Sequence, residues 1–125
     1  INSLVICECI YWFGGVHYRP SDLVELINAV TGWDYTVDEF MTTGERINTL
    51  CRAFNVREGI ARKDDRLPSR FMEPLQGGPT EGQVITNEEF ESMLNNYYDI
   101  CGWDIETGIP TKKKLEELGL AFVNL

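Results

Sequence analysis

The sequence has little of what would set it apart from ordinary globular proteins. Its 125 residues include one histidine, four cysteines and five prolines. Uninterrupted apolar runs, such as residues 10–13, are far shorter than the ~20 residues that a membrane-spanning helix needs. No basic segment precedes a long apolar stretch near the start, as it would in a secretory signal. The sequence therefore predicts no membrane partner and favours a cytoplasmic location.

Basic residues are also scarce. Lysine and arginine number 11 against 20 acidic residues, which gives a net charge of -9. Nucleic-acid binding through a basic face is therefore not expected. The few cations are unevenly placed, because residues 46–70 hold seven of them and only three acids. Two interpretations stay open: a solvated loop with internal ion pairs, or a basic band that faces an acidic neighbour or an anionic cofactor.

The cysteines lack the spacing of a self-contained metal site. Cys7, Cys9, Cys51 and Cys101 form no CxxC pair, and His17 is the single histidine, for which a structural role is expected. Reduced, buried thiols are the ordinary interpretation, and Cys51 and Cys101 fall on predicted apolar helix faces. If one of these cysteines binds metal, the other ligands must come from elsewhere.

Helix signals dominate, and they predict an all-α fold: an irregular helical domain of about five helices covering residues 1–125. Thr36 with Glu39 and Thr86 with Glu89 form capping boxes, in which each side chain satisfies a free backbone amide of the other. Helix starts are expected at residues 2–3, 20–21, 36, 86 and 111, with the first helix running to residue 13.

Apolar spacing predicts which helix faces are buried. The three tryptophans, each near a turn, are expected to close the core. The residues expected inside are Leu23, Val24, Leu26, Ile27 and Val30, then Phe40, Met41, Ile47, Leu50, Cys51 and Phe54, then Phe90, Met93, Leu94, Tyr97 and Ile100, then Leu115 and Leu118, with Trp12, Trp33 and Trp103.

The stretch from about residue 57 to residue 84 interrupts this pattern with repeated glycines and prolines. It predicts a long loop, and compact domains seldom carry a loop of this length without a purpose. Asp64 and Asp65 lie within it, flanked by Lys63 and Arg66, and are expected to be ion-pair partners. No nucleophile–base pair or phosphate-binding loop is present, so composition and spacing end at a helical domain without an assigned function.

A series of short motifs carries more information. The chain resembles the C-terminal part of the aldehyde ferredoxin oxidoreductase family, the tungsten-pterin enzymes, over nearly its whole length and in the same order. The matching segments are residues 28–33 (NAVTGW), 44–47 (GERI), 54–59 (FNVREG), 62–71 (RKDDRLPSRF), 97–98 (YY), 102–104 (GWD), 108–111 (GIPT) and 114–120 (KLEELGL).

The resemblance implies that the chain is the C-terminal fragment of a larger oxidoreductase. Family members oxidise aldehydes to carboxylic acids and pass electrons through one [4Fe–4S] cluster to ferredoxin. A tungsten (or molybdenum) bis-pterin lies in an N-terminal domain, and the catalytic residues also lie upstream, so none is expected here. The implied partners are the upstream domains of the same chain, ferredoxin and a small aldehyde. The isolated fragment is expected to be inactive and to hold no cofactor.

The same resemblance implies a site at the beginning of the chain. The family has an Asp-x-x-Gly-Leu-Cys motif that supplies the fourth cluster ligand and contacts the pterin. Asn2, Val5, Ile6 and Cys7 occupy its positions, so Cys7 matches the metal ligand, and Asn2 and Ile6 match the cofactor-binding residues. Asparagine keeps a carbonyl acceptor but loses the charge of the aspartate. Cys9 is the competing candidate for the ligand.

Two other functions stay open at this stage. The loss of the motif aspartate at residue 2 is compatible with a helical interaction module that no longer carries out redox chemistry. A branch of the family that acts on another substrate, such as an aromatic thioester, is the second alternative. The sequence leaves open which aldehyde is used, which of the two metals is bound and whether the protein is a homodimer.

Overall fold

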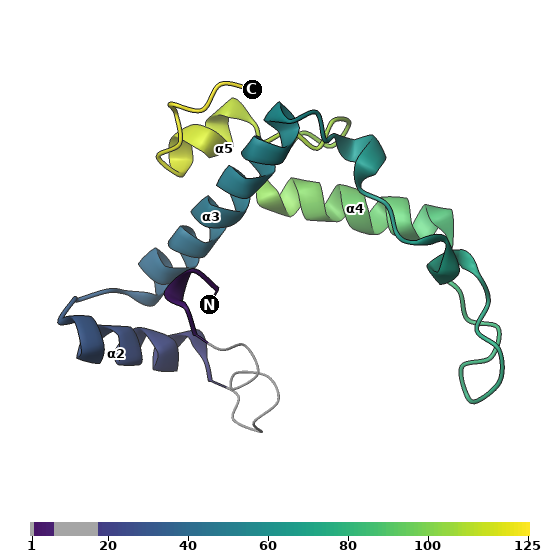
Figure 1. Cartoon of the computed structure of the whole chain (residues 1–125), viewed down its shortest axis with the longest axis horizontal. Helices are drawn as coiled ribbons and strands as arrows, with labels where there is room; N and C mark the ends of the chain where they lie inside the picture. Colours follow the sequence, from purple (N-terminus) through teal and green to yellow (C-terminus); the bar gives the residue numbers. More distant parts are fainter. Residues whose placement is uncertain (1, 7–17) are drawn as a thin grey trace. The chain divides into compact units, whose positions relative to one another are not determined.

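The computed structural model describes residues 2–6 and 18–125. Within these residues the regular structure is helical, without a strand, which confirms the all-α prediction. No described helix is long and apolar enough to cross a membrane. Four α-helices are present where about five helices were expected (Figure 1): α2 (Pro20–Thr31), α3 (Val37–Arg57), α4 (Asn87–Cys101) and α5 (Lys112–Glu117).

The predicted first helix differs from the structure. Residues Asn2–Leu4 form a single turn of 3-10 helix, and the turn ends at Val5, whose φ is 57°. A residue in this left-handed region cannot continue a right-handed helix. The expected extension through residues 7–13 lies outside the described residues.

The predicted helix ends agree closely with the structure. In both capping boxes the glutamate amide donates to the threonine hydroxyl at 3.2 Å, and the threonine amide donates to the glutamate carboxylate at 2.9 Å. Helices α2 and α4 end at Gly32 and Gly102, which adopt φ of 74° and 68°. Glycine is favoured at such positions because it has no Cβ to clash in the left-handed conformation.

The chain divides into two compact units, Ile1–Gly44 and Glu45–Leu125, with the boundary inside α3. In the first unit α2 buries Leu23, Val24 and Ile27. The Asn28 side chain holds the following turn, because its amide donates to the Tyr35 carbonyl and its oxygen accepts from the Tyr35 amide, both at 2.9 Å.

In the second unit α5 and the residues after it form a small apolar cluster of Leu115, Leu118 and Leu120. Two long-range contacts attach this cluster to α3, beside which α5 lies in Figure 1. Arg46 Nε donates to the Leu118 carbonyl at 2.7 Å, and Lys114 Nζ pairs with Glu45 at 2.6 Å.

Several burial predictions were wrong. On α3 the buried residues are Thr49, Arg52 and Ala53, and Arg52 among them contacts Gly108 of the 103–110 segment. Most apolar residues of the predicted stripe lie on other sides of α3 and are exposed. Exposed residues that were expected inside are Leu26, Val30, Trp33, Met41, Ile47, Leu50, Cys51, Phe54, Met93, Tyr97 and Ile100.

The predicted loop is confirmed, since residues 58–86 contain no α-helix. Two 3-10 turns, Arg62–Asp64 and Ser69–Met72, give it local structure. Farther along, the Leu75 amide donates to Gln83 and the Gly82 amide donates back to Leu75, at 2.9 and 2.8 Å, which closes a narrow turn. In Figure 1 the loop runs along α4 and turns back beyond the first residues of that helix.

Candidate functional site

The residues predicted to face the cofactors lie at the beginning of the chain. The Asn2 backbone belongs to the 3-10 turn, and the Ile6 side chain is half-buried. Cys7, the predicted cluster ligand, and Cys9, its competitor, lie outside the described residues. The assignment of Asn2, Ile6 and Cys7 therefore stays a prediction.

Val5 has an unusual backbone conformation for its residue type. Its φ of 57° is the only positive value at a non-glycine position among the described residues, and its side chain is 93% exposed. A β-branched side chain clashes with its own backbone in this region, at a cost of about 1–2 kcal/mol. A position with this backbone is one at which glycine is the residue of lowest energy.

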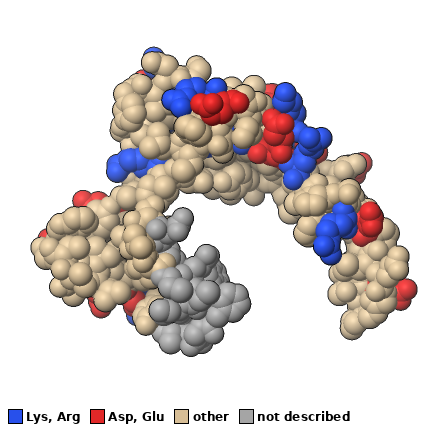
Figure 2. Space-filling view, in the orientation of Figure 1, with Lys and Arg blue, Asp and Glu red and all other residues tan. Residues whose placement is uncertain are grey.

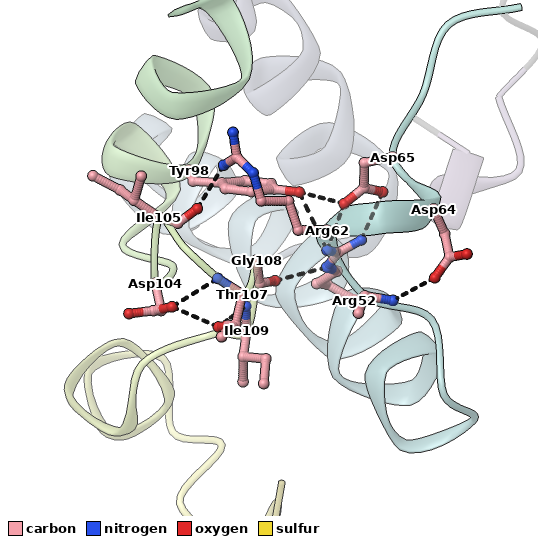
Figure 3. A network of polar contacts seen from close by, with 11 residues as sticks. Arg52, Arg62, Asp64, Asp65, Tyr98, Asp104, Ile105, Thr107, Gly108 and Ile109 are labelled. Carbon is pink, nitrogen blue, oxygen red and sulfur yellow. Dashed lines mark hydrogen bonds and ion pairs between the residues drawn. The ribbon is translucent and has the colours of Figure 1, made fainter. Parts of the chain in front are cut away.

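Within the second unit, the long loop is fastened by a network around Arg52 (Figure 3). The guanidinium forms a two-pronged ion pair with Asp65, with N–O distances of 2.9 and 2.6 Å, and its Nε donates to the Gly108 carbonyl at 2.8 Å. The Tyr98 hydroxyl donates to the same carboxylate. The guanidinium carbon lies 5.3 Å from the centre of the Trp103 ring, within cation–π distance.

The charges of this network are balanced. Burial opposes ionisation of Asp65, but hydrogen bonds from Arg52 and Tyr98 outweigh it and hold the pKa of that carboxyl below its usual value. Burial, and then the hydrogen bond to the Asp65 carboxylate, raises the pKa of the Tyr98 hydroxyl to about 12. At neutral pH the pair is therefore ionised, and the tyrosine is a neutral donor.

The loop at residues 104–108 completes the network because its backbone approaches closely. Gly108 has φ of 70°, and a Cβ at this position would lie 2.8 Å from Tyr98 Oη and closer still to Arg52. The loop is held by Asp104, whose carboxylate accepts from the Thr107 amide at 2.8 Å and from the Thr107 hydroxyl at 2.6 Å. These hydrogen bonds lower the pKa of Asp104.

Arg62 forms a second attachment of the long loop. Its guanidinium donates to the Ile105 carbonyl and pairs with Glu91 on α4, and its carbon lies 5.3 Å from the centre of the Tyr98 ring. Its own amide donates to the Thr107 carbonyl at 3.1 Å. Arg52 and Arg62 thus join α3, α4, the long loop and the 104–108 turn.

The basic band at residues 46–70 divides into cations that serve the fold and cations that do not. In the face shown in Figure 2, basic side chains lie beside acidic ones. Lys63, Arg66 and Arg70 form no ion pair with any residue of the described ranges. The cations with partners are Arg46 with the Leu118 carbonyl, Arg52 with Asp65, Arg57 with Glu58 and Arg62 with Glu91.

A cavity of about 250 Å³ lies beside this network, between α3 and α4. The Trp103 indole N–H, one of the groups beside it, is buried without an acceptor within the described part of the chain. No group of three His, Cys, Asp or Glu side chains in that part is placed to hold a metal. The contacts of the network hold the long loop and the 104–108 turn against α3 and α4.

Sequence analysis missed the partner of Asp65, which is Arg52 on α3 rather than its neighbours Lys63 and Arg66. An arginine within a helix face of otherwise small residues was the available signal. Gly108 within the GIPT motif was a second one, because motif glycines commonly mark close backbone approaches. Neither signal identifies the partner, since contacts between residues 13 to 56 positions apart depend on the tertiary fold.

Comparison with known proteins identifies the family of the chain. The family model described as aldehyde ferredoxin oxidoreductase, domains 2 and 3, matches residues 1–120. The chain belongs to the aldehyde ferredoxin oxidoreductase family. It is 43% identical over 102 residues to the tungsten-containing aldehyde ferredoxin oxidoreductase of Pyrococcus furiosus, a match that covers 80% of this chain and 16% of that protein.

Two further similar proteins have names that indicate other substrates. The WOR-like subunit of an aliphatic sulfonate oxidoreductase from Pyrococcus furiosus is 36% identical, over 95% of this chain and 19% of that protein. A chain in the BamBC active site complex of benzoyl coenzyme A reductase, solved with 1,5 dienoyl-CoA, matches with a TM-score of 0.68 and 30% identity over 85% of this chain and 14% of that one. The chain thus spans a fifth or less of the length of these relatives.

Proposed function

We propose that the full-length protein oxidises aldehydes to carboxylic acids and passes the electrons through a [4Fe–4S] cluster to ferredoxin. The similarity to tungsten-containing aldehyde ferredoxin oxidoreductases over most of the chain supports this activity. This chain contributes the C-terminal domain and one cluster ligand, Cys7. The tungsten (or molybdenum) bis-pterin and the cluster, when bound, supply the redox chemistry, and the protein positions them.

The backbone of Val5 is the observation that best supports the Cys7 assignment. In the Asp-x-x-Gly-Leu-Cys motif, glycine stands two residues before the ligand cysteine. Val5 stands two residues before Cys7 and has the left-handed backbone that glycine favours. Aligning Cys9 with the ligand would move the glycine position to Cys7. The conformation of Val5 therefore supports the alignment in which Cys7 is the ligand.

The chemistry of the donors is consistent with this proposal. Thiolate is the ligand that iron–sulfur clusters use, and a single thiolate cannot hold a cluster. As the family resemblance implies, the remaining cluster ligands come from upstream parts of the full-length protein. Asn2 stands where the motif has aspartate, so a neutral amide oxygen replaces the carboxylate as the hydrogen-bond acceptor for the pterin.

Paired substitutions in the full-length protein test the ligand. Cys7→Ala is expected to lose the cluster, whereas Cys9→Ala, the matched control two residues away, keeps about four irons per chain. Iron analysis and electron paramagnetic resonance of anaerobically purified protein measure both variants. A full cluster in Cys7→Ala, or loss of it only in Cys9→Ala, would contradict the assignment.

A second candidate substrate has its own support. The structural similarity to a chain of benzoyl coenzyme A reductase favours an aromatic thioester as the alternative substrate. Dye-linked assays with aldehydes, and separately with aromatic thioesters and a reduced viologen, discriminate the two. Aldehyde-dependent dye reduction supports the proposal, whereas turnover of the thioester alone would replace it with the alternative.

An interaction module without redox function is the remaining alternative, and the loss of the motif aspartate at residue 2 favours it. Iron content again decides, because a module of this kind holds no cluster. A colourless full-length protein without iron after anaerobic purification would support the module and overturn the enzyme.

A further inference from the structure

The second unit leaves much of its apolar surface exposed. Among residues 45–125, all of which the structure describes, six hydrophobic side chains are buried, whereas thirteen large hydrophobic side chains are exposed. Helices that are stable in water normally bury their apolar stripe against a neighbour. The exposed stripes of this unit are therefore surfaces that lack a neighbour within residues 45–125.

One group of these side chains forms a groove between α3 and the C-terminal residues. The groove has a volume of about 540 Å³. Leu50 and Phe54, one helical turn apart on α3, are 42% and 55% exposed, and Phe122 and Leu125 on the facing segment are 73% and 49% exposed. The remaining lining residues are Ala53, Arg57, Val123 and Asn124.

The charge of the groove restricts its occupant. Arg57 is the only charged side chain in the lining, and its guanidinium lies 5.0 Å from the centre of the Phe54 ring and pairs with Glu58. Interfaces that separate and re-form are small and polar, whereas permanent ones resemble a domain core cut in half. An apolar lining with one paired charge is typical of the permanent class, which disfavours a transient electron acceptor.

The length of the relatives indicates where a permanent partner comes from. Matches that cover 80% and 95% of this chain cover 16% and 19% of the relatives concerned. In those relatives, about four-fifths of the polypeptide lies outside the matching segment. A neighbouring part of the same polypeptide is therefore available, at high effective concentration, to cover the groove.

We infer that the groove formed by Leu50, Phe54, Phe122 and Leu125 is the docking site for the preceding part of the same polypeptide. The occupant is an apolar segment that covers both phenylalanines and leaves Arg57 at the edge. This inference rests on the proposal that the chain is one domain of a larger oxidoreductase, and it adds the surface by which that domain is attached.

Photo-crosslinking in the full-length protein identifies the occupant. Benzoylphenylalanine replaces Phe54 or Phe122, which it resembles in shape, and replaces Lys113 on α5 as a control whose side chain is 87% exposed. After irradiation, mass spectrometry of the digested protein locates the attached peptide. The expected products are crosslinks within one polypeptide. The Phe54 and Phe122 adducts lie on peptides preceding residue 1, and the Lys113 position gives only background yield.

A labelling experiment measures how completely the groove is covered. Phe122→Cys is expected to react with a maleimide at least about tenfold more slowly than Lys113→Cys, because a covered thiol reacts only on local opening. Adducts to a second copy, to another protein or to residues 1–44, or equal labelling of the two cysteines, would each overturn the inference. Neither readout depends on iron content or turnover. The docking inference can therefore fail or succeed whatever the Cys7 variant shows.

Discussion

At the scale of single residues, two positions show how backbone conformation limits the choice of amino acid. Val5 adopts a left-handed conformation although it is β-branched, and Gly108 adopts one where a side chain would clash with Arg52 and Tyr98. The penalty at Val5 is intrinsic to the residue, whereas a side chain at Gly108 would meet the same intrinsic penalty and a clash with its neighbours. Substitutions at these two positions should therefore have opposite effects.

Val5→Gly is expected to stabilise the N-terminal turn by about 1 kcal/mol, because glycine removes the clash between Cβ and backbone. Val5→Ala keeps a Cβ and should gain less. Hydrogen exchange of the amides at residues 2–6 in the full-length protein measures the difference. Faster exchange in Val5→Gly than in the wild type would contradict the conformation described for this residue.

Gly108→Ala is expected to destabilise the second unit by about 3 kcal/mol, the sum of the left-handed penalty and of overpacking against Arg52 and Tyr98. Gly119→Ala is a matched control, since its φ of 69° is nearly the same and nothing lies near its Cβ. The control should lose only about 1 kcal/mol. Native-state hydrogen exchange of α3 and α4 amides compares them, and equal losses would exclude the close approach.

At the scale of helices and loops, the Arg52–Asp65 pair determines where the long loop begins its path along α4. Removing one partner leaves a buried charge uncompensated, which is more costly than removing an exposed pair. Asp65→Asn is therefore expected to destabilise α3, α4 and the loop by about 2–3 kcal/mol. Glu58→Gln, which breaks the exposed pair with Arg57, should change stability by less than about 0.5 kcal/mol.

Asp65 and Tyr98 of this network predict that stability is lost at opposite ends of the pH range. The lowered pKa of Asp65 adds stability above the ordinary carboxyl pKa of about 4, and this stability is lost as the pH falls through the lower folded value. The raised pKa of Tyr98 adds stability below about pH 10, which is lost as the pH rises toward about 12.

Measuring unfolding free energy against pH in the full-length protein separates these limbs. Asp65→Asn should flatten the acid limb, and Tyr98→Phe should flatten the alkaline limb and cost about 1 kcal/mol at neutral pH for the lost hydrogen bond. Acid and alkaline limbs unchanged in the two variants would show that the network does not hold the second unit together.

At the scale of the whole molecule, the unpaired cations of the basic band are the residues available to a neighbour. We expect Lys63 and Arg66 to face an anionic group of the full-length enzyme, either the pterin phosphates or an adjoining acidic surface. Arg62 belongs to the same basic band, but it pairs with Glu91 and serves the fold. Its substitution would therefore confuse the two effects.

The double substitution of Lys63 and Arg66 by glutamine is expected to lower the tungsten content of the purified full-length protein. Substituting Lys112 and Lys113, which removes the same charge from α5, is the control and should leave the content unchanged. Metal analysis measures both. Full tungsten content in the first variant would exclude a role for these cations in cofactor retention.

The sequence by itself determined the starts of α2, α3, α4 and α5 and the family. Capping boxes, terminal glycines and the Gly/Pro-rich loop depend on interactions between residues a few positions apart, so they were predicted correctly. The order of the motifs was likewise readable without a structure. The alignment of Cys7 with a ligand cysteine was also made from the sequence, and it stays a prediction.

Only the tertiary structure decided which helix faces are covered. The apolar residues Leu50 and Phe54 are exposed. Arg52, which lies between them in the sequence, is buried and contacts Asp65, Tyr98 and Gly108. Periodicity identifies a face that favours burial but not the surface that buries it. The physical reason is that burial depends on neighbours far away in the sequence, such as Gly108, whose carbonyl accepts from Arg52 across 56 positions.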